Sequence, residues 1–474
     1  MWINLQPKSA LFRQTLAAIL IGAVPGMAIG TVLGYSAVML PRLGSKFSLE
    51  EKSWIASITA IFPIFSCFMA GILAQKIGRK ISLLIFLSLT CTGWIILPFA
   101  KESFALLMVS RIFQGFGIIL SLLQLYLVEI SELRNRDLNC SFPSIFVNIG
   151  ITVIYIADTL IDDWSYVAVF GAGCTALSIL LIILCGVPES PYWLIQIGRT
   201  EDAIKNLEKL RDLDSIPQEI DNITETIKNN GKMANSFKEQ IQELNSLEVL
   251  KPLMILLIVG SLSQATGQYA VAFYAVDIII EFLPNLRNEA YYTAIGVGLL
   301  RVIASILGIF FIKKFKRRSL LMSHSFMMGL CLFAISAIVG LKPFFRPEIV
   351  ASRGWVFQIL PLVLLSLYSL FFGLGVNLIP YLLVGELCPS KIKNLTSSLS
   401  IGLMSISIFT VVKIFPTLLA TIGCSMTYLF YGSFCMGLAI FTYCCVPETS
   451  NKSLQELQGI FRKEIQKDTE SSRL

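Results

Sequence analysis

Two carboxylates occupy matching positions in the two halves of this 474-residue chain. Glu189 lies in the segment PESPYWL (188–194) and Glu448 in PETSNKSLQEL (447–457), and each segment begins within a residue or two of the end of a long apolar run. We therefore expect each carboxylate at the end of an apolar helix, where a guanidinium can pair with it through charge-assisted hydrogen bonds. This recurrence divides the chain into halves that look like copies of one another.

Other charged residues recur at the ends of apolar runs in both halves. Glu129 and Arg136 are seven residues apart in the first half, as are Glu386 and Lys393 in the second. A single charge at a helix end is usually an interfacial anchor, but two matched sets favour a shared function. We interpret them as a latch of ion pairs spanning the two halves, which closes the cytoplasmic mouth in one state and breaks in another. The predicted rim charges are Arg79, Arg111, Glu129, Arg136, Glu189, Arg317, Arg318, Glu386, Lys393 and Glu448.

The composition is that of a membrane protein. The mean hydropathy is +0.72, with 55% hydrophobic and 15% charged residues. Apolar segments of about 20 residues, long enough to cross about 30 Å of hydrocarbon as helices, recur along the whole chain. Because an unpaired polar backbone is unfavourable in lipid, we expect an all-α membrane protein. We predict twelve membrane helices, at about 14–40, 53–74, 81–100, 103–129, 139–161, 164–186, 252–281, 290–312, 319–341, 355–385, 395–420 and 424–446.

One long polar stretch, 187–251, separates the first six predicted helices from the last six. Ala203, Leu207 and Leu210 form an apolar face there at helical spacing, and a further amphipathic stretch covers about 234–248. We therefore favour short helices on the cytoplasmic face over a flexible linker. The predicted organisation is a six-helix half at 1–186, a helical cytoplasmic insert at 187–251, a second six-helix half at 252–446 and a cytoplasmic tail at 447–474.

The net charge of +7 does not indicate a nucleic-acid partner, because its placement follows a membrane topology. Lys and Arg are more frequent in the segments after the second, fourth, eighth and tenth predicted helices than on the opposite side. The positive-inside rule then places both termini in the cytoplasm. A duplicated helical bundle of this kind is typical of secondary transporters, whose solute site lies near the midplane between the halves.

These motifs resemble the sugar-porter branch of the major facilitator superfamily, and the resemblance covers nearly the whole chain. Within that branch the chain is most similar to insect facilitated trehalose transporters, through LVGELCPSKIK (383–393) and FTVVK (409–413). The resemblance implies the major facilitator fold and a carrier of trehalose or a hexose that works by alternating access. We expect a multi-pass protein of the plasma membrane that functions as a monomer, with the solute and the lipid bilayer as its partners.

The resemblance also implies a sugar site of amides and an indole, from which this chain departs. Among the aligned positions, only Gln264 keeps an amide. Gln268, expected one turn further along the same helix face, and Asn377 can supply replacement donors and acceptors. The predicted substrate-binding residues are Gln264, Gln268, Asn377, Tyr381, Arg301, Ser144 and Tyr269.

Arg301 is the most unusual of these residues, because it falls near the middle of a predicted membrane helix. A guanidinium at that depth must face a wet cavity or a partner. One reading is an internal ion pair with Asp277 or Glu281. The other is a cation in the substrate path that selects a polar or anionic solute.

Three functions remain open at this point. The first is a facilitative sugar carrier, the second is a carrier of a non-sugar and possibly anionic solute, and the third is a sensor that binds a solute without moving it. The first predicted helix contains no Asp or Glu, which favours uniport over proton coupling. No nucleophile–base set, metal-ligand spacing or phosphate loop stands out, so we expect no enzyme activity, catalytic residue, metal or cofactor.

Overall fold

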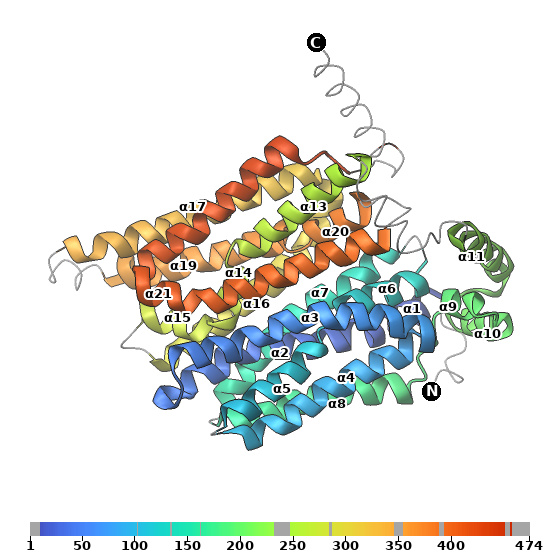
Figure 1. Cartoon of the computed structure of the whole chain (residues 1–474), viewed down its shortest axis with the longest axis horizontal. Coiled ribbons are helices and arrows are strands. Elements are labelled where there is room, and N and C mark those ends of the chain that lie inside the picture. The colour runs from blue at the N-terminus through green and yellow to red at the C-terminus, as the bar shows by residue number, and fades with distance from the viewer. Residues whose placement is uncertain are drawn as a thin grey trace, which may run out of the picture. The chain divides into compact units, whose positions relative to one another are not determined.

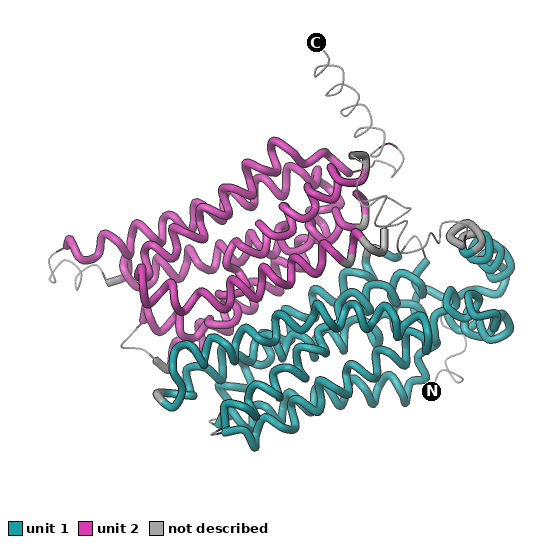
Figure 2. Tube along the Cα trace, viewed as in Figure 1, with its two compact units in different colours: residues 1–234 teal, residues 235–474 magenta. Residues whose placement is uncertain are grey.

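The computed structural model describes residues 10–101, 103–132, 135–161, 163–231, 247–283, 287–345, 354–387, 393–450 and 456. All regular elements in these ranges are helical, which confirms the predicted all-α class. The chain divides into two compact units, Met1–Ala234 and Asn235–Leu474, which Figure 2 shows in different colours. The helices of the polar insert belong to the first unit, so the structure groups them with the first six-helix half.

Unit 1 is built from long helices that lie side by side, with shorter helices at one end (Figure 1). Ser48 begins the second long helix with a capping box, in which its side chain accepts from the backbone N–H of Glu51 and the Glu51 side chain accepts from the backbone of Ser48. The helices are α1 (Ala10–Ala18), the π-helix η2 (Ile19–Ala23), α2 (Val24–Arg42), α3 (Leu49–Ile77), α4 (Arg79–Ile96), α5 (Phe104–Phe116), α6 (Leu120–Ile130), α7 (Arg136–Leu160), α8 (Trp164–Leu184), α9 (Pro191–Gln196), α10 (Thr200–Leu210) and α11 (Ile216–Gly231).

The prediction of an apolar helix face in the insert is confirmed. Ala203, Leu207 and Leu210 of α10 are all buried, and α10 packs on α9 and α1. Burying this face stabilises a short helix that would be marginal alone. The insert is therefore helical as predicted over α9 to α11, whereas most of the amphipathic stretch at 234–248 lies outside the described residues.

Unit 2 has the same kind of architecture, and several of its membrane segments are interrupted. Its first segment breaks into three helices, and another contains a π-helix. The helices are α13 (Leu247–Ala265), α14 (Gln268–Phe273), α15 (Ala275–Phe282), α16 (Arg287–Lys314), α17 (Arg317–Leu341), α19 (Gly354–Phe371), the π-helix η7 (Phe372–Val376), α20 (Ile379–Leu387) and α21 (Lys393–Cys445).

Eleven helices within the described ranges are long and apolar enough to cross a membrane. The last of them, Leu399–Cys445, bends at Gly423, whose φ of 81° and ψ of 169° are not helical. Its two parts match the last two predicted helices, 395–420 and 424–446, so the bend accounts for the difference from twelve. The predicted continuous helix at 252–281 is wrong, because the chain leaves helical geometry between α13, α14 and α15.

Candidate functional site

In unit 1, Arg79 and Glu129 form a bidentate ion pair at the junction of α3, α4 and α6. Arg79 Nε donates to Glu129 Oε2 at 2.8 Å and Arg79 Nη2 donates to Oε1 at 2.7 Å. Arg79 Nη1 donates to the carbonyl of Ala74 at 2.7 Å. The two paired side chains are only 4% and 8% exposed. A pair so well shielded from water is weakly screened, and the loss of one partner would leave a buried charge uncompensated.

Glu189 binds the start of α4. Its carboxylate accepts from the backbone N–H of Arg79 at 2.9 Å and of Lys80 at 3.1 Å. It therefore caps a helix whose preceding residue, Gly78, has no side chain to do so. Burial raises the pKa of the Glu189 carboxyl, while hydrogen bonds from the backbone of Ser190, Lys80 and Arg79 oppose the increase. The sequence predicted a guanidinium partner, but the hydrogen bonds described for this carboxylate come from backbone N–H groups.

Unit 2 repeats this arrangement. Arg317, the first residue of α17, forms an ion pair with Glu386 of α20. Glu448 accepts from the backbone N–H of Arg317 at 3.0 Å and of Arg318 at 3.3 Å. The Arg318 guanidinium donates to the carbonyl of Tyr443 and lies 5.8 Å from the centroid of its ring. Each unit thus combines an Arg–Glu pair with a second glutamate that caps the helix beginning at that arginine.

Both Arg–Glu pairs join helices of the same unit, whereas we expected pairs between the halves. Two other predicted rim charges are Arg136 and Lys393. Arg136 begins α7, and its Nε is buried with no hydrogen-bond partner among the described residues. Lys393 begins α21, but its side chain lies outside the described part of the chain. Roles for these two residues stay predictions.

Arg111 is buried inside unit 1 among neutral groups. Its Nη1 donates to Gln114 Oε1 at 2.6 Å, its Nη2 donates to Ser36 Oγ, and its Nε donates to the carbonyl of Ile55 at 3.4 Å. The guanidinium carbon lies 5.9 Å from the centroid of the Tyr35 ring. The side chain is fully shielded from solvent. This set of polar and aromatic contacts is what a cation within a membrane span requires.

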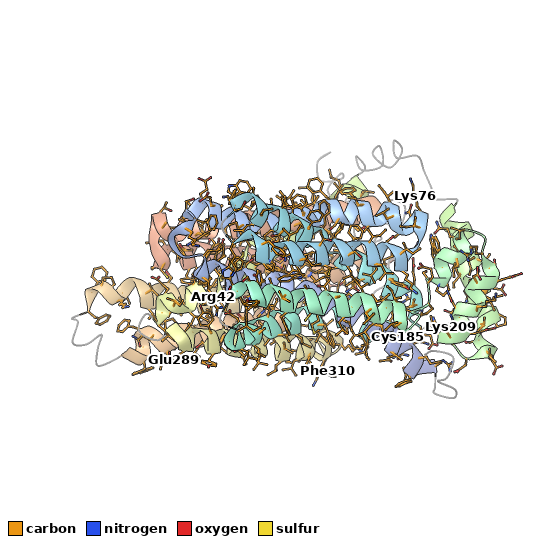
Figure 3. The ribbon with its side chains drawn as sticks, turned by 90° about the horizontal axis from the view of Figure 1, so that it is seen from below. Arg42, Lys76, Cys185, Lys209, Glu289 and Phe310 are labelled. Atoms are coloured by element: carbon orange, nitrogen blue, oxygen red, sulfur yellow. The ribbon has the colours of Figure 1, made fainter. Side chains whose placement is uncertain are left out.

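The predicted rim position of Arg111 is therefore wrong. Its partner Ile55 lies near the start of α3, whereas the Ala74 carbonyl that binds Arg79 lies near the end of that helix. Figure 3 shows the same two ends of unit 1, with Lys76 near the insert and Arg42 far from it. The sequence motif around Arg111 indicates a membrane helix but does not fix the depth of the arginine within it.

In unit 2, Gln264 and Gln268 lie on either side of a break in the membrane segment. Gly267, between α13 and α14, has a φ of +93°, and a Cβ there would lie 2.8 Å from the Tyr431 ring. Both glutamines are buried, and Gln268 Nε2 donates to Ser369 Oγ at 3.2 Å. The Oε1 atoms of both glutamines have no hydrogen-bond partner among the described residues. The predicted spacing on one continuous helix is wrong, but the two amides remain buried together near an interrupted helix, a typical setting for a solute site in a transporter.

Tyr269, Tyr381 and Arg301 lie close together. The Tyr269 side chain shares a hydrogen bond with Tyr381 and lies within electrostatic reach of Arg301. It also packs edge-on against Phe372, with 6.2 Å between ring centroids. Arg301 lies in the middle of α16 and is 7% exposed, as its sequence position indicates. Predicted substrate-binding residues from α14 and α20 therefore meet, with Arg301 of α16 within electrostatic reach, whereas an ion pair of Arg301 with Asp277 or Glu281 stays a prediction.

Two further predicted substrate-binding residues, Asn377 and Ser144, lie in different units. Asn377 follows the π-helix η7, and its backbone N–H donates to the carbonyl of Phe372 at 2.9 Å. This contact places Asn377 beside the residue that packs on Tyr269, and π-helical turns are frequent at functional sites. Ser144 belongs to unit 1, where its carbonyl accepts from Asn148 Nδ2 at 3.2 Å. A role for Ser144 beside the residues of unit 2 stays a prediction.

The chain matches known proteins over nearly its whole length. A family model described as sugar (and other) transporter matches residues 16–461. The chain belongs to this sugar transporter family. It is 30% identical over 455 residues to the sugar transporter ERD6-like 6 of Arabidopsis thaliana, covering 94% of this chain and 90% of the relative. It is 29% identical over 457 residues to the facilitated trehalose transporter Tret1 of Bombyx mori, covering 95% and 87%.

Solved structures share the fold of this sugar transporter. The inward-open xylose transporter XylE of E. coli superposes with a TM-score of 0.78 at 19% identity, covering 95% of this chain and 99% of that one. The proton:xylose symporter XylE bound to 6-bromo-6-deoxy-D-glucose gives a TM-score of 0.75 at 20% identity, with 95% and 99% coverage. The predicted major facilitator fold is confirmed. The protein is a multi-pass membrane transporter and, as its family indicates, not an enzyme.

Residues that were not predicted from the sequence hold the insert of this sugar transporter against its bundle. Arg211, whose side chain is 1% exposed, donates from Nε and Nη2 to the carboxylate of Glu219 at 2.7 and 2.8 Å. Its Nη1 donates to the carbonyl of Ile130 at the end of α6, at 3.0 Å. Gln14 of α1 donates to Glu132 at 2.6 Å and to the carbonyl of Leu210 at 3.1 Å. Helical spacing could not have found Arg211, because α10 ends at Leu210 and the backbone of Arg211 is extended.

Proposed function

We propose that the protein is a facilitative carrier that moves a sugar, trehalose or a hexose, across the plasma membrane by alternating access. The observation that carries this proposal is the pair of buried amides in unit 2. Gln264 and Gln268 keep their Oε1 atoms without a hydrogen-bond partner among the described residues, at a cost of about 1–3 kcal/mol each. Sugar hydroxyls are donors that satisfy such acceptors. The names of the Arabidopsis and Bombyx relatives support the same solute class.

The aromatic neighbours suit a sugar ring as well. Tyr381 and Tyr269 share a hydrogen bond, and each combines an apolar face with a polar hydroxyl. Asn377, whose backbone N–H donates to the carbonyl of Phe372, adds a further amide side chain. We propose Gln264, Gln268, Asn377, Tyr381, Tyr269 and Arg301 as the substrate-binding residues of unit 2, and separately Ser144 as a substrate-binding residue of unit 1.

A second solute class, a polar anion, is favoured by one observation. Arg301 places a guanidinium, 7% exposed, in the middle of a membrane helix beside Tyr269. A charged side chain in the middle of a membrane helix is energetically unfavourable, and such residues usually have a function, such as binding an anionic group. The two solute classes predict opposite effects for the same substitution, which makes them separable.

The rim residues supply the switching step in this proposal. Arg79–Glu129 and Arg317–Glu386 hold neighbouring helices together within their units, while Glu189 and Glu448 fix the starts of α4 and α17. We propose that these contacts belong to one conformation and are rearranged in the other, so that they set the balance between the two.

The proposal includes a membrane topology, an oligomeric state and a mode of coupling. Both termini and the insert are cytoplasmic, the protein works as a monomer, and transport needs no coupled proton, since residues 10–42 contain neither Asp nor Glu. A peptide tag placed in the insert should be inaccessible to antibody in intact cells and accessible after permeabilisation. Labelling of the tag from outside intact cells would overturn this topology.

Uptake in oocytes against a panel of labelled sugars and organic anions tests the function. For a sugar carrier, Gln264→Ala should raise the half-saturation concentration about tenfold, the size of one lost hydrogen bond of roughly 1.4 kcal/mol. Arg301→Asn should then preserve sugar uptake, whereas for an anion carrier it should abolish uptake. The matched control is Ser263→Ala, because the Ser263 hydroxyl donates to the carbonyl of Val259 at 2.7 Å within its own helix.

Two results would contradict the proposal. Uptake that responds to neither Gln264→Ala nor Arg301→Asn would place the substrate site elsewhere. Saturable binding of a sugar to the purified protein, without any uptake or exchange in vesicles, would indicate a sensor in place of a carrier.

A further inference from the structure

We propose that a groove between the end of α16 and the start of α17 binds the headgroup of an anionic phospholipid. The groove has a volume of about 410 Å³. The residues that line it and carry the argument are Phe311, Phe315, Lys316, Ser319, Ser323 and His324. This site belongs to unit 2 alone and is independent of which solute the protein carries.

The location of the groove favours a lipid over a soluble ligand. The membrane span Glu289–Lys314 ends beside it and the span Arg317–Phe344 begins beside it. Lipid headgroups lie at that depth. Phe310, 65% exposed on α16, and Phe315, 46% exposed, present aromatic rings to the surroundings at the same level (Figure 3 labels Phe310). Aromatic side chains at the ends of membrane helices are suited to this boundary between apolar chains and headgroups.

The charge around the groove selects an anion. Lys313, Lys314 and Lys316 are all exposed, and no ion pair to any of them is found in the part of the chain that the structure describes. Lys316 lines the groove itself, and the Lys314 ammonium lies 5.9 Å from the centroid of the Phe315 ring. None of the groove-lining residues is acidic. Several basic residues beside membrane helices attract anionic lipid headgroups.

The groove does not depend on the dipole of α17. The backbone N–H groups of Arg317 and Arg318 already donate to Glu448, and the Arg317 side chain pairs with Glu386. The Ser323 hydroxyl donates to the carbonyl of Leu320 at 3.2 Å, so the lysines and the Ser319 hydroxyl are the groups available to a phosphate. Lys316, Ser319 and Ser323 recur at intervals of three and four residues, so they share one face of the helix.

His324 supports a built site. The residue is only 7% exposed, lines the groove, and has an Nδ1 with no hydrogen-bond partner among the described residues. Its ring lies between Phe311 and Phe371, with ring centroids at 6.4 and 6.0 Å. A Cβ added at Gly375 would lie 2.6 Å from Nδ1, so the imidazole touches the π-helix η7 that leads to Asn377.

The test uses the purified full-length protein in phosphatidylcholine vesicles with and without phosphatidylserine. Phosphatidylserine should raise the temperature of thermal unfolding, because a ligand that binds the folded state stabilises it. Combined substitution Lys313→Gln, Lys314→Gln and Lys316→Gln should reduce the apparent affinity for phosphatidylserine about a hundredfold, since each lysine near an anionic surface contributes about fivefold. The matched controls Lys76→Gln in unit 1 and Lys342→Gln at the opposite end of α17 should behave as the unsubstituted protein does.

A second variant separates a groove from diffuse attraction. Ser323→Phe fills the groove at an exposed position and leaves all three lysines in place. Loss of the phosphatidylserine effect in both the lysine variant and Ser323→Phe supports the proposal. An effect retained in either one overturns it, because then the lysines or the groove are not needed. Inorganic phosphate reproducing the effect in phosphatidylcholine vesicles would also overturn it, since the site would take a free anion and not a lipid.

Discussion

The substitution Glu129→Gln tests the proposed switching role of the buried ion pair in unit 1. Arg79 gives Glu129 two hydrogen bonds, at 2.7 and 2.8 Å, between side chains that are 4% and 8% exposed. Breaking a buried pair by removing one charge costs about 3–5 kcal/mol. Glutamine keeps one acceptor oxygen for the guanidinium, so we expect about 2 kcal/mol, equivalent to a factor of about 30 in the balance between conformations.

The assay compares net uptake with equilibrium exchange in vesicles. If the pair exists in only one conformation, Glu129→Gln should slow net uptake by an order of magnitude or more, by the same arithmetic. Asp202→Asn is the matched control, because Arg199 and Asp202 form a surface pair with side chains 60% and 39% exposed. An exposed pair contributes about 0.2–1 kcal/mol and should not affect transport.

A double substitution distinguishes switching from folding. Arg79→Gln with Glu129→Gln removes both charges, so no uncompensated charge remains and thermal stability should recover. Transport should stay slow if the pair controls the conformational balance. A double variant that regains the original uptake rate together with its stability would refute a switching role for the pair, as would unchanged net uptake and exchange in Glu129→Gln.

Three other substitutions give further expectations. Burial raises the pKa of the Glu189 carboxyl above its ordinary 4.5, so the folded state binds this proton more tightly than the unfolded state does. That contribution to stability is lost as the pH rises above 4.5. The unfolding temperature of the unsubstituted protein should therefore fall relative to that of Glu189→Gln over this pH range, and a constant difference would contradict this. Gly267→Ala should lower the unfolding temperature and impair transport, because an alanine at a φ of +93° is strained by about 1–3 kcal/mol and meets Tyr431; an unaltered unfolding temperature would argue against that strain. Glu386→Gln should slow net uptake less than Glu129→Gln, because the side chains of its pair are 21% and 26% exposed; equal effects in the same vesicle assay would contradict the role of burial.

The sequence indicated which charged residues lie at helix ends, because that signal is local, but it predicted ion pairs between the halves and not the pairs found within each unit. Glu129 lies at the end of one apolar run and Arg79 at the start of another, and helix ends on one side of a membrane are brought together by the topology alone. The pairing partner was harder to predict. Glu189 and Glu448 accept from backbone N–H groups, and those donors have no signature in the amino-acid sequence.

The break at Gly267 could not be predicted, because its cause is distant in the sequence. Glycine is common in membrane helices and does not by itself interrupt one. Here the ring of Tyr431, from α21, lies where a Cβ at position 267 would project. The placement of Gln268 depends in the same way on Ser369 of α19. Contacts between residues distant in the sequence decide which predicted polar residues share a site. They depend on how the whole unit packs, so the sequence alone does not show them.

The two units repeat the same chemistry with different degrees of shielding. In each, an arginine at the first position of a helix pairs with one glutamate while a second glutamate binds the backbone at that helix start. The Arg79–Glu129 pair is almost fully shielded, whereas the side chains of Arg317 and Glu386 keep 21% and 26% of their exposure. Since water and salt screen an exposed pair more than a buried one, we expect the Arg317–Glu386 pair to be the weaker of the two. The carrier proposed here therefore has one strong and one weak set of rim contacts, and the weaker one should respond first to ionic strength and to the lipid beside α17.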